Sequence, residues 1–165
     1  MRPFASAVET WASLPGIDRI TAWTRVAELG ADRTQFPSAA HAASWAGLCP
    51  GQEESAGKRR SGRTRPGNLW LRRAWTQAAW GASLTKGSYF QAFYHRLAGR
   101  KGKQRAIVAV AQGLLSTGYL LLWTGRKFSD LGEDYFERLD GERLTKRLVK
   151  RLEKLGHQVS LQPAA

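Results

Sequence analysis

The chain has 165 residues, a single cysteine, and a net charge of +13 from 26 Lys and Arg against 13 Asp and Glu. This length suits one ordinary domain or two small ones, and a hydrophobic content of 42% excludes wholesale disorder. The lone Cys49 excludes an internal disulfide framework and favours a reducing compartment, so we expect a cytoplasmic protein. No charged segment followed by an apolar run opens the sequence, so no secretory signal is expected.

The positive charge is concentrated in the middle third of the chain. Residues 1–50 hold four basic and four acidic side chains, residues 51–105 hold thirteen and two, and residues 106–165 hold nine and seven. Such a concentrated positive block is typical of a protein that binds a polyanion. Nucleic acid is the first candidate, an anionic membrane surface the second, and a merely solvated face the third.

The first fifty residues predict three short helices. A helix over 5–13 and a second over 18–29, with Ile20, Trp23 and Ala27 on one face, flank a tight Pro15-Gly16 turn. This outline is that of a helix-hairpin-helix, in which Gly16 would let the backbone approach a phosphate; an αα-hairpin that needs a glycine is the alternative. A third helix is predicted over 38–47, capped by Ser38 and stopped by Gly47, with His41 in a structural role.

Residues 50–67 contain two prolines, four glycines, five basic residues and no large apolar residue, which predicts a long loop. Loops of this length in compact domains are usually functional or disordered. Further helices are predicted after it: one over 69–84 with Asn68 as its cap, one over 89–99 after Ser88, a central one over 106–123, and a last one after Asp140.

Three of these later segments leave alternatives open. The aromatic stripe of Tyr89, Phe93 and Leu97 fits core packing or a base-stacking platform, with core packing favoured. The basic connector 99–103 fits phosphate contact or a solvated turn. The uncharged run 106–123 is close to the length of a membrane span, but we interpret it as the central buried helix, with no membrane partner.

The last helix is expected to lie on the surface, with a leucine stripe of Leu144, Leu148, Leu152 and Leu155 and a basic back. No strand pattern is convincing. The fold is therefore predicted to be mainly α: a helix-hairpin-helix-like segment over 1–48, a compact helical domain over 49–156 that contains the basic loop 50–67, and a tail over 157–165.

The acidic residues do not form a recognisable metal site. A metal-dependent nuclease needs several converging carboxylates, whereas the only tight cluster here is Asp130, Glu133 and Asp134, which helix N-terminal charge explains. No His and Cys spacing suits zinc, and no phosphate-cradling loop is present. The remaining candidate is Ser55 in the basic loop, a small nucleophile beside cations that could stabilise charge on a phosphate; an inert loop serine is the alternative.

Several runs of the sequence, taken together, resemble one protein family. They are Leu14-Pro15-Gly16-Ile17, Ala27 to Gly30, Phe36-Pro37-Ser38-Ala39, Ala43 to Gly51, Glu54-Ser55-Ala56-Gly57-Lys58, Arg63 to Asn68, and Leu71-Arg72. The chain is similar to the C-terminal transposase domain of the DEDD transposases, the insertion-sequence recombinases that are guided by a bridge RNA.

The resemblance implies a role in DNA transposition. In that family this domain supplies a serine that attacks DNA and forms a transient phosphoserine link; by position Ser55 matches it, and Ser61 matches less well. The residues expected to bind nucleic acid are Gly16, Lys58, Arg59, Arg60, Arg63, Arg65, Arg72 and Arg73. DNA is the expected partner, with a structured guide RNA and homo-oligomers as further partners.

The family's acidic DEDD domain is not found in this sequence, and the chain is therefore expected to bind nucleic acid but not to recombine DNA alone. No cofactor is expected in this chain, because magnesium would be held by the DEDD domain. Two alternatives stay open: a non-catalytic helical nucleic-acid-binding module, such as a truncated transposase remnant, and a basic RNA-binding protein.

Overall fold

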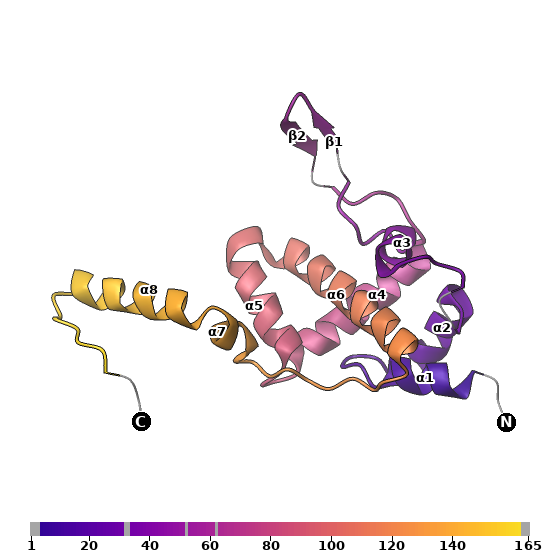
Figure 1. The fold of residues 1–165 in the computed structure, drawn as a ribbon. Coiled ribbons are helices and arrows are strands. Elements are labelled where there is room, and N and C mark those ends of the chain that lie inside the picture. The colour runs from indigo at the N-terminus through magenta and orange to yellow at the C-terminus, as the bar shows by residue number, and fades with distance from the viewer. Residues whose placement is uncertain (1–3, 32–33, 52, 62, 163–165) are drawn as a thin grey trace.

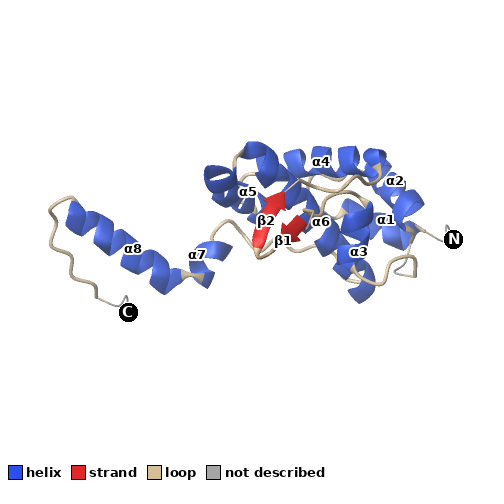
Figure 2. Ribbon diagram, turned by 90° about the horizontal axis from the view of Figure 1, so that it is seen from above, coloured by secondary structure: helices blue, strands red, loops and turns tan. Residues whose placement is uncertain are grey.

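The computed structural model describes residues 4–31, 34–51, 53–61 and 63–162, without the side chains of residues 53–55, 58–61 and 143. It is mainly helical, as the sequence predicts. A two-stranded hairpin rises from one side of a body of packed helices, and the last two helices extend from the end opposite the N-terminus (Figures 1 and 2). The elements in chain order are α1 (Ala5–Ala12), α2 (Arg19–Leu29), α3 (Ala39–Trp45), β1 (Glu53–Ser55), β2 (Lys58–Ser61), α4 (Leu69–Leu84), α5 (Tyr89–Lys101), α6 (Lys103–Thr124), α7 (Tyr135–Leu139) and α8 (Gly141–Lys154).

Four helices begin at a polar side chain that accepts a hydrogen bond from a backbone N–H of the first turn. The predicted caps of α3, α4 and α5 are confirmed: Ser38, Asn68 and Ser88 accept at 3.4, 3.0 and 3.2 Å. Asp18 does the same for α2 at 2.7 Å. These bonds satisfy N–H groups that have no partner within their own helix, so the local sequence fixes where each helix starts.

The predicted central helix is α6, which packs against α1, α3, α4 and α5. By length and composition alone α6 could cross a membrane. Its buried residues nevertheless recur at helical spacing, and the helices packed around it cover this apolar face, as expected for the core helix of a globular domain. They are Ala106, Ile107, Val110, Ala111, Leu114, Leu115 and Gly118.

The core is centred on two tryptophans. Trp11 of α1 and Trp75 of α4 are fully buried, and their rings meet edge to face with centroids 5.3 Å apart. One cluster of buried hydrophobic side chains includes residues from Ala7 to Leu115, so segments on both sides of residue 48 share it. The predicted boundaries of the two segments and the tail stay predictions.

The face of α2 that carries Ile20 and Trp23 is exposed, with 78% and 39% of those residues accessible. The buried face instead holds Ala22, Arg25, Val26 and Leu29. Arg25 is buried because its guanidinium donates to the backbone oxygens of Thr21 and Ala74 and stacks over Trp75. An arginine in a helix normally marks the solvated face, which is why the pattern alone does not reveal this packing.

The prediction that residues 50–67 form only a loop is wrong, because β1 and β2 pair there as an antiparallel hairpin. Its turn is Ala56-Gly57, with φ of 51° and 73°. Positive φ at both central residues is the geometry of the two-residue turns that match strand twist. Ala-Gly is a weaker sequence signal for that turn than Asn-Gly, and the strands contain no large apolar residue, so no strand pattern was visible.

The last helix also departs from expectation. Asp140 precedes α8 but makes no capping bond with its side chain; its Oδ2 instead accepts from Arg96 of α5 at 2.9 Å. Along the leucine stripe, Leu148, Leu152 and Leu155 are exposed. Beyond the half-buried Leu144, the stripe therefore does not pack on the helical body, and α8 is attached to that body mainly through α7 (Figure 1).

Candidate nucleic-acid interface

The base of the hairpin is fixed to the helical body by close backbone packing. Gly51 N donates to Arg63 O at 2.7 Å, and Asn68 N donates to Trp45 O at 2.9 Å. A Cβ on Gly67 would lie 2.4 Å from the backbone nitrogen of Gly47, so only glycine permits this approach. The two chains leading to the strands are thus held together between α3 and the start of α4.

Asn68 also links this base to α2. Its Oδ1 caps α4, while its Nδ2 donates to Glu28 Oε2 at 2.9 Å. One side chain therefore sets the start of α4 and ties the base of the hairpin to a second helix. The hairpin stands on a rigid support, which is what positioning a reactive or binding group requires.

Ser55, the predicted nucleophile, ends β1 and stands opposite Lys58 in the register, directly before the Ala56-Gly57 turn. This places its backbone at the tip of the hairpin, away from the helical body (Figure 1). Ser61 is at the far end of β2, opposite Glu53. The two candidate serines therefore occupy different ends of the same hairpin.

The predicted phosphate-binding residues fall into two groups around the hairpin. Lys58, Arg59 and Arg60 form most of β2, but their side chains, like that of Ser55, lie outside the described part of the structure. The strand register places Arg59 opposite Glu54, and a bulge leaves Arg60 as the extra residue of β2. Bulges of this kind bend and twist a strand, so the basic run is not a regular ribbon.

The second group lies beside the base of the hairpin and on α4. Arg63 and Arg65 are exposed on the segment that follows β2 and leads back to the helical body. Arg72 and Arg73 are in the first turns of α4, where Arg72 is half-buried and Arg73 is exposed, with its guanidinium 6.0 Å from the ring centre of Trp70. The structure therefore brings the basic hairpin and the start of α4 to one side of the molecule.

Gly16 lies in the turn between α1 and α2 and packs against a later part of α4. With φ at +75°, its Cα faces α4, and a Cβ there would meet the backbone oxygen of Ala78 at 2.2 Å; Gly81 faces it across the contact. The helical hairpin of α1 and α2 is therefore pressed against α4 at a point where only glycines fit. A phosphate contact at Gly16 stays a prediction.

Two exposed tryptophans beside the base of the hairpin were missed by the sequence reasoning. Trp45 ends α3 and is 54% exposed, and Trp70 in the first turn of α4 is 73% exposed. The signal was available, because helical periodicity places Leu71 and Trp75 in the core and so turns Trp70 outward. Exposed aromatic rings beside arginines are a feature of surfaces on which nucleic-acid bases stack.

Two ionisable groups, the buried Arg25 and the half-buried Cys49, do not add to this surface. Burial lowers the pKa of the Arg25 guanidinium to about 10, and both of its terminal nitrogens are bonded to backbone oxygens inside the protein. Burial also raises the pKa of the Cys49 thiol, which makes a reactive thiolate unfavourable. Arg25 and Cys49 are structural residues.

Asp130 and Asp134, two of the three acidic residues at 130–134, make contacts within the fold. Asp130 Oδ1 accepts from the backbone nitrogens of Tyr89 and Gly132, both at 2.8 Å, and Asp134 pairs with Arg138 at 3.1 Å. Among the described residues, no group of three or more His, Cys, Asp or Glu gathers as a metal site would require. The described carboxylates therefore do not fit the catalytic magnesium of a recombinase.

Comparison with known proteins identifies a family for this chain. A family model described as the Transposase IS116/IS110/IS902 family matches residues 8–95, which is more than half of the chain. The matched segment runs from α1 through the hairpin and α4 to the middle of α5, so it contains the complete base of the hairpin. No curated protein matches the chain.

Proposed function

Because the chain belongs to the IS116/IS110/IS902 transposase family, we propose that it is the part of a transposase that binds DNA and supplies Ser55 as the nucleophile of strand exchange. Membership of the family implies an interaction with DNA in transposition. The observation that carries the finer proposal is the position of Ser55, next to the turn of a basic hairpin that stands away from the helical body.

The chemistry proposed for Ser55 is a transesterification. Its hydroxyl oxygen bonds to the phosphorus of a DNA phosphodiester, its proton passes to a base, and the bond from phosphorus to one DNA oxygen breaks. That oxygen takes up a proton and becomes a free hydroxyl end, while the phosphate stays on the serine. A hydroxyl end of a second strand then reverses the step and releases Ser55, with no oxidant or reductant.

The cations near the hairpin would stabilise the charge on the reacting phosphate and would bind the phosphates on either side of it. Negative charge grows on the phosphate as the serine bonds to it, and nearby guanidinium groups stabilise such charge most effectively where water is excluded. Arg63, Arg65 and Arg73 are exposed beside the hairpin, and they are proposed to contact the flanking phosphates. Arginine suits this role because its planar donors match a phosphate in pairs.

The general base and the metal are proposed to come from outside the described residues. We propose an acidic partner domain of the DEDD kind, a guide RNA and an assembly of several copies around DNA, as the family resemblance implies. Consistent with an origin outside this region, the described carboxylates gather at no common point. Strand exchange by the purified chain with magnesium, without any partner, would contradict this division of labour.

The decisive test is Ser55→Ala in a reaction that contains this chain, a DEDD domain of the same family, magnesium and a donor DNA. We expect no covalent protein–DNA product on a denaturing gel and no strand exchange, with affinity for DNA unchanged. Ser61→Ala is the matched control, because it removes a hydroxyl from the same hairpin, and it should keep both activities. Full activity of Ser55→Ala, or its loss in Ser61→Ala, would overturn the assignment.

A non-catalytic nucleic-acid-binding module is the second candidate, favoured by the same lack of gathered carboxylates. It predicts that Ser55→Ala leaves every measurable property unchanged. A structural RNA-binding protein would bind a folded RNA far more tightly than duplex DNA. In each case the triple variant Arg59→Gln/Arg60→Gln/Arg63→Gln should make the affinity for nucleic acid less dependent on salt, because each neutralised phosphate releases about one counterion. An unchanged slope of log affinity against log salt would mean that the hairpin does not contact the nucleic acid.

A further inference from the structure

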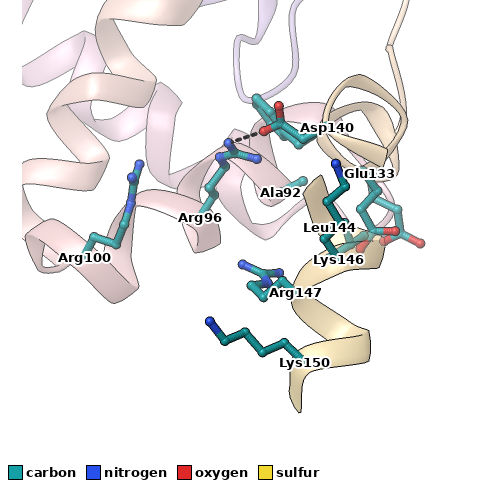
Figure 3. A pocket seen from close by; sticks show the side chains of 11 residues that line it. Ala92, Arg96, Arg100, Glu133, Asp140, Leu144, Lys146, Arg147 and Lys150 are labelled. Atoms are coloured by element: carbon teal, nitrogen blue, oxygen red, sulfur yellow. Dashed lines mark hydrogen bonds and ion pairs between the residues drawn. The ribbon is translucent and has the colours of Figure 1, made fainter. Parts of the chain in front are cut away.

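An open cleft of about 820 Å³ lies between α5 and the last two helices, and all of its lining residues except Ala92 lie beyond the segment that the family model matches. Figure 3 shows its side chains, which come from two walls that are far apart in sequence. One wall is α5 with Ala92, Arg96 and Arg100. The other wall is Glu133, Phe136, Glu137, Asp140, Leu144, Lys146, Arg147 and Lys150.

One arginine of the cleft is already used to build it. Arg96 donates to Asp140 Oδ2 at 2.9 Å, and its guanidinium lies 5.0 Å from the ring centre of Phe136. This contact joins α5 to the end of α7 and so fixes the place from which α8 extends. Arg96 is a positioning residue for the cleft and is not counted among its free cations.

Besides Arg96, four cations line the cleft, namely Arg100, Lys146, Arg147 and Lys150. Arg100 of α5 and Arg147 and Lys150 of α8 form no ion pair with any described residue, and they lie at the end of the cleft away from Glu133 (Figure 3). Like charges brought together from two helices repel one another. An anion between the helices would convert this repulsion into attraction.

The orientation of α8 supports an anionic occupant. Lys146, Arg147 and Lys150 of α8 line the cleft together with Leu144, whereas the next three leucines of the stripe are exposed, although their burial would be favourable in an isolated chain. An anion in the cleft would stabilise this orientation. Arg100 also belongs to the basic turn 99–103 between α5 and α6, which lies at the edge of the helical body from which the hairpin rises (Figure 1).

We propose that this cleft is a second nucleic-acid contact, in which Arg100, Arg147 and Lys150 bind the phosphodiester backbone. The inference rests on the proposed function in that it takes DNA or its guide RNA as the ligand, and it adds a surface separate from the hairpin. A backbone suits the cleft better than a small anion, because the cleft is open and its cations come from two separate helices. Phosphate contacts of this kind position a nucleic acid without reading its sequence.

The test compares two variants that each remove three positive charges. Arg100→Gln/Arg147→Gln/Lys150→Gln changes the cleft, and Arg126→Gln/Lys127→Gln/Lys154→Gln changes exposed cations that do not line it. Binding to duplex DNA, single-stranded DNA and a folded RNA is measured by fluorescence anisotropy over a range of salt. Circular dichroism and light scattering confirm that both variants keep the fold and oligomeric state of the parent.

The cleft variant is expected to lose up to three phosphate contacts. For duplex DNA, each lost contact lowers by about 0.9 the slope of log affinity against log salt concentration, and it weakens binding roughly fivefold near ~0.15 M salt. For the triple variant this corresponds to a loss of affinity of roughly ten- to a hundredfold. The control should lose less than about threefold, because exposed charges outside the contact act only through screened long-range attraction. Amide exchange in α8 and at residues 96–102 should slow when the probe binds to the parent.

The outcomes separate the two proposals. If the parent binds and the two variants match in affinity and slope, the cleft inference falls while the hairpin proposal stands. If the parent binds none of the three probes, nucleic-acid binding as a whole falls, and the cleft inference with it. A cleft defect seen with folded RNA but not with DNA assigns the contact to the guide, and the reverse assigns it to DNA.

Discussion

Replacing Gly118 by alanine is expected to damage the core of this protein, although alanine is the better helix former. Gly118 lies in α6 directly against Trp11, and a Cβ there would be 1.9 Å from Cζ3 and 2.5 Å from Cε3 of the indole ring. Trp11 is fully buried against Trp75, so its ring has no open space into which to move. Either the tryptophan leaves its rotamer or α6 moves away from α1.

The size of the effect is the difference between two opposing contributions. Alanine in a helix interior gains about 1 kcal/mol over glycine, whereas overpacking a core costs about 1–3 kcal/mol and sometimes more. Contacts this short with a fixed ring place the cost at or above the upper end, for a net loss of about 2 kcal/mol. For a chain of this length the midpoint of thermal unfolding should fall by about 4–8 °C.

Gly113 is the matched control in the same helix. A Cβ at position 113 would lie 3.6 Å from ring carbons of Phe90 and Phe93, an ordinary contact, so Gly113→Ala should raise the unfolding free energy by up to about 1 kcal/mol. Urea unfolding monitored by circular dichroism measures both variants. Adding Trp11→Phe, which removes the outer ring atoms, should recover part of the loss in Gly118→Ala as a non-additive term.

The reasoning would be refuted if Gly118→Ala were as stable as Gly113→Ala. It would also fail if Trp11→Phe and Gly118→Ala destabilised additively, since additivity means that the two positions do not touch.

Three further predictions concern the buried Arg25, the helix cap Asp18 and the hairpin-turn residue Ala56. Arg25→Ala should lower the unfolding free energy by about 3 kcal/mol, because a buried side chain and two hydrogen bonds to carbonyl oxygens are lost. Arg25→Lys should recover only part of this loss, because an ammonium cannot reproduce the planar donors of a guanidinium. Urea unfolding measures both variants. The backbone N–H of Thr21 lowers the pKa of Asp18 below 3.8, so this carboxylate favours the folded state at higher pH and loses that effect as the pH falls through its folded pKa. Asp18→Asn should therefore show a shallower fall of Tm below pH 3.8 than the parent. Ala56→Asn should slow amide exchange in the hairpin, because asparagine tolerates the positive φ of that turn position better than alanine; unchanged exchange would mean that the turn is not strained.

Much of the helical architecture could be predicted from sequence, because the information for it is local. A cap at Ser38, Asn68 or Ser88 depends on a side chain and an N–H three residues later. The burial of Leu71 and Trp75 depends on apolar spacing within one helix. The concentration of positive charge is equally a property of the sequence itself.

The candidate site was predicted less completely. Ser55 and the basic run were found, but their pairing into a hairpin was not, since strands without large apolar residues carry no alternating pattern. Trp45 and Trp70 beside its base were missed, although the exposure of Trp70 followed from the helical spacing of Leu71 and Trp75. The cleft between α5 and α8 could not be predicted, because its walls are far apart in sequence and are joined by contacts such as the ion pair of Arg96 with Asp140 and the stacking of Phe93 on Phe136.

The sequence by itself determined most of the helices, the caps of α3, α4 and α5 and the location of the positive charge, since each depends on neighbours within a turn or two. Only the tertiary structure decided which face of each helix has a partner. It buried Arg25 of α2 and left Ile20 exposed, and it turned the basic side of α8 toward α5. It also made Gly113 and Gly118, two glycines of one helix, differ in their tolerance of a Cβ, because only Gly118 has the ring of Trp11 against its Cα. Such contacts join residues distant in sequence, and no local pattern encodes the distance between them.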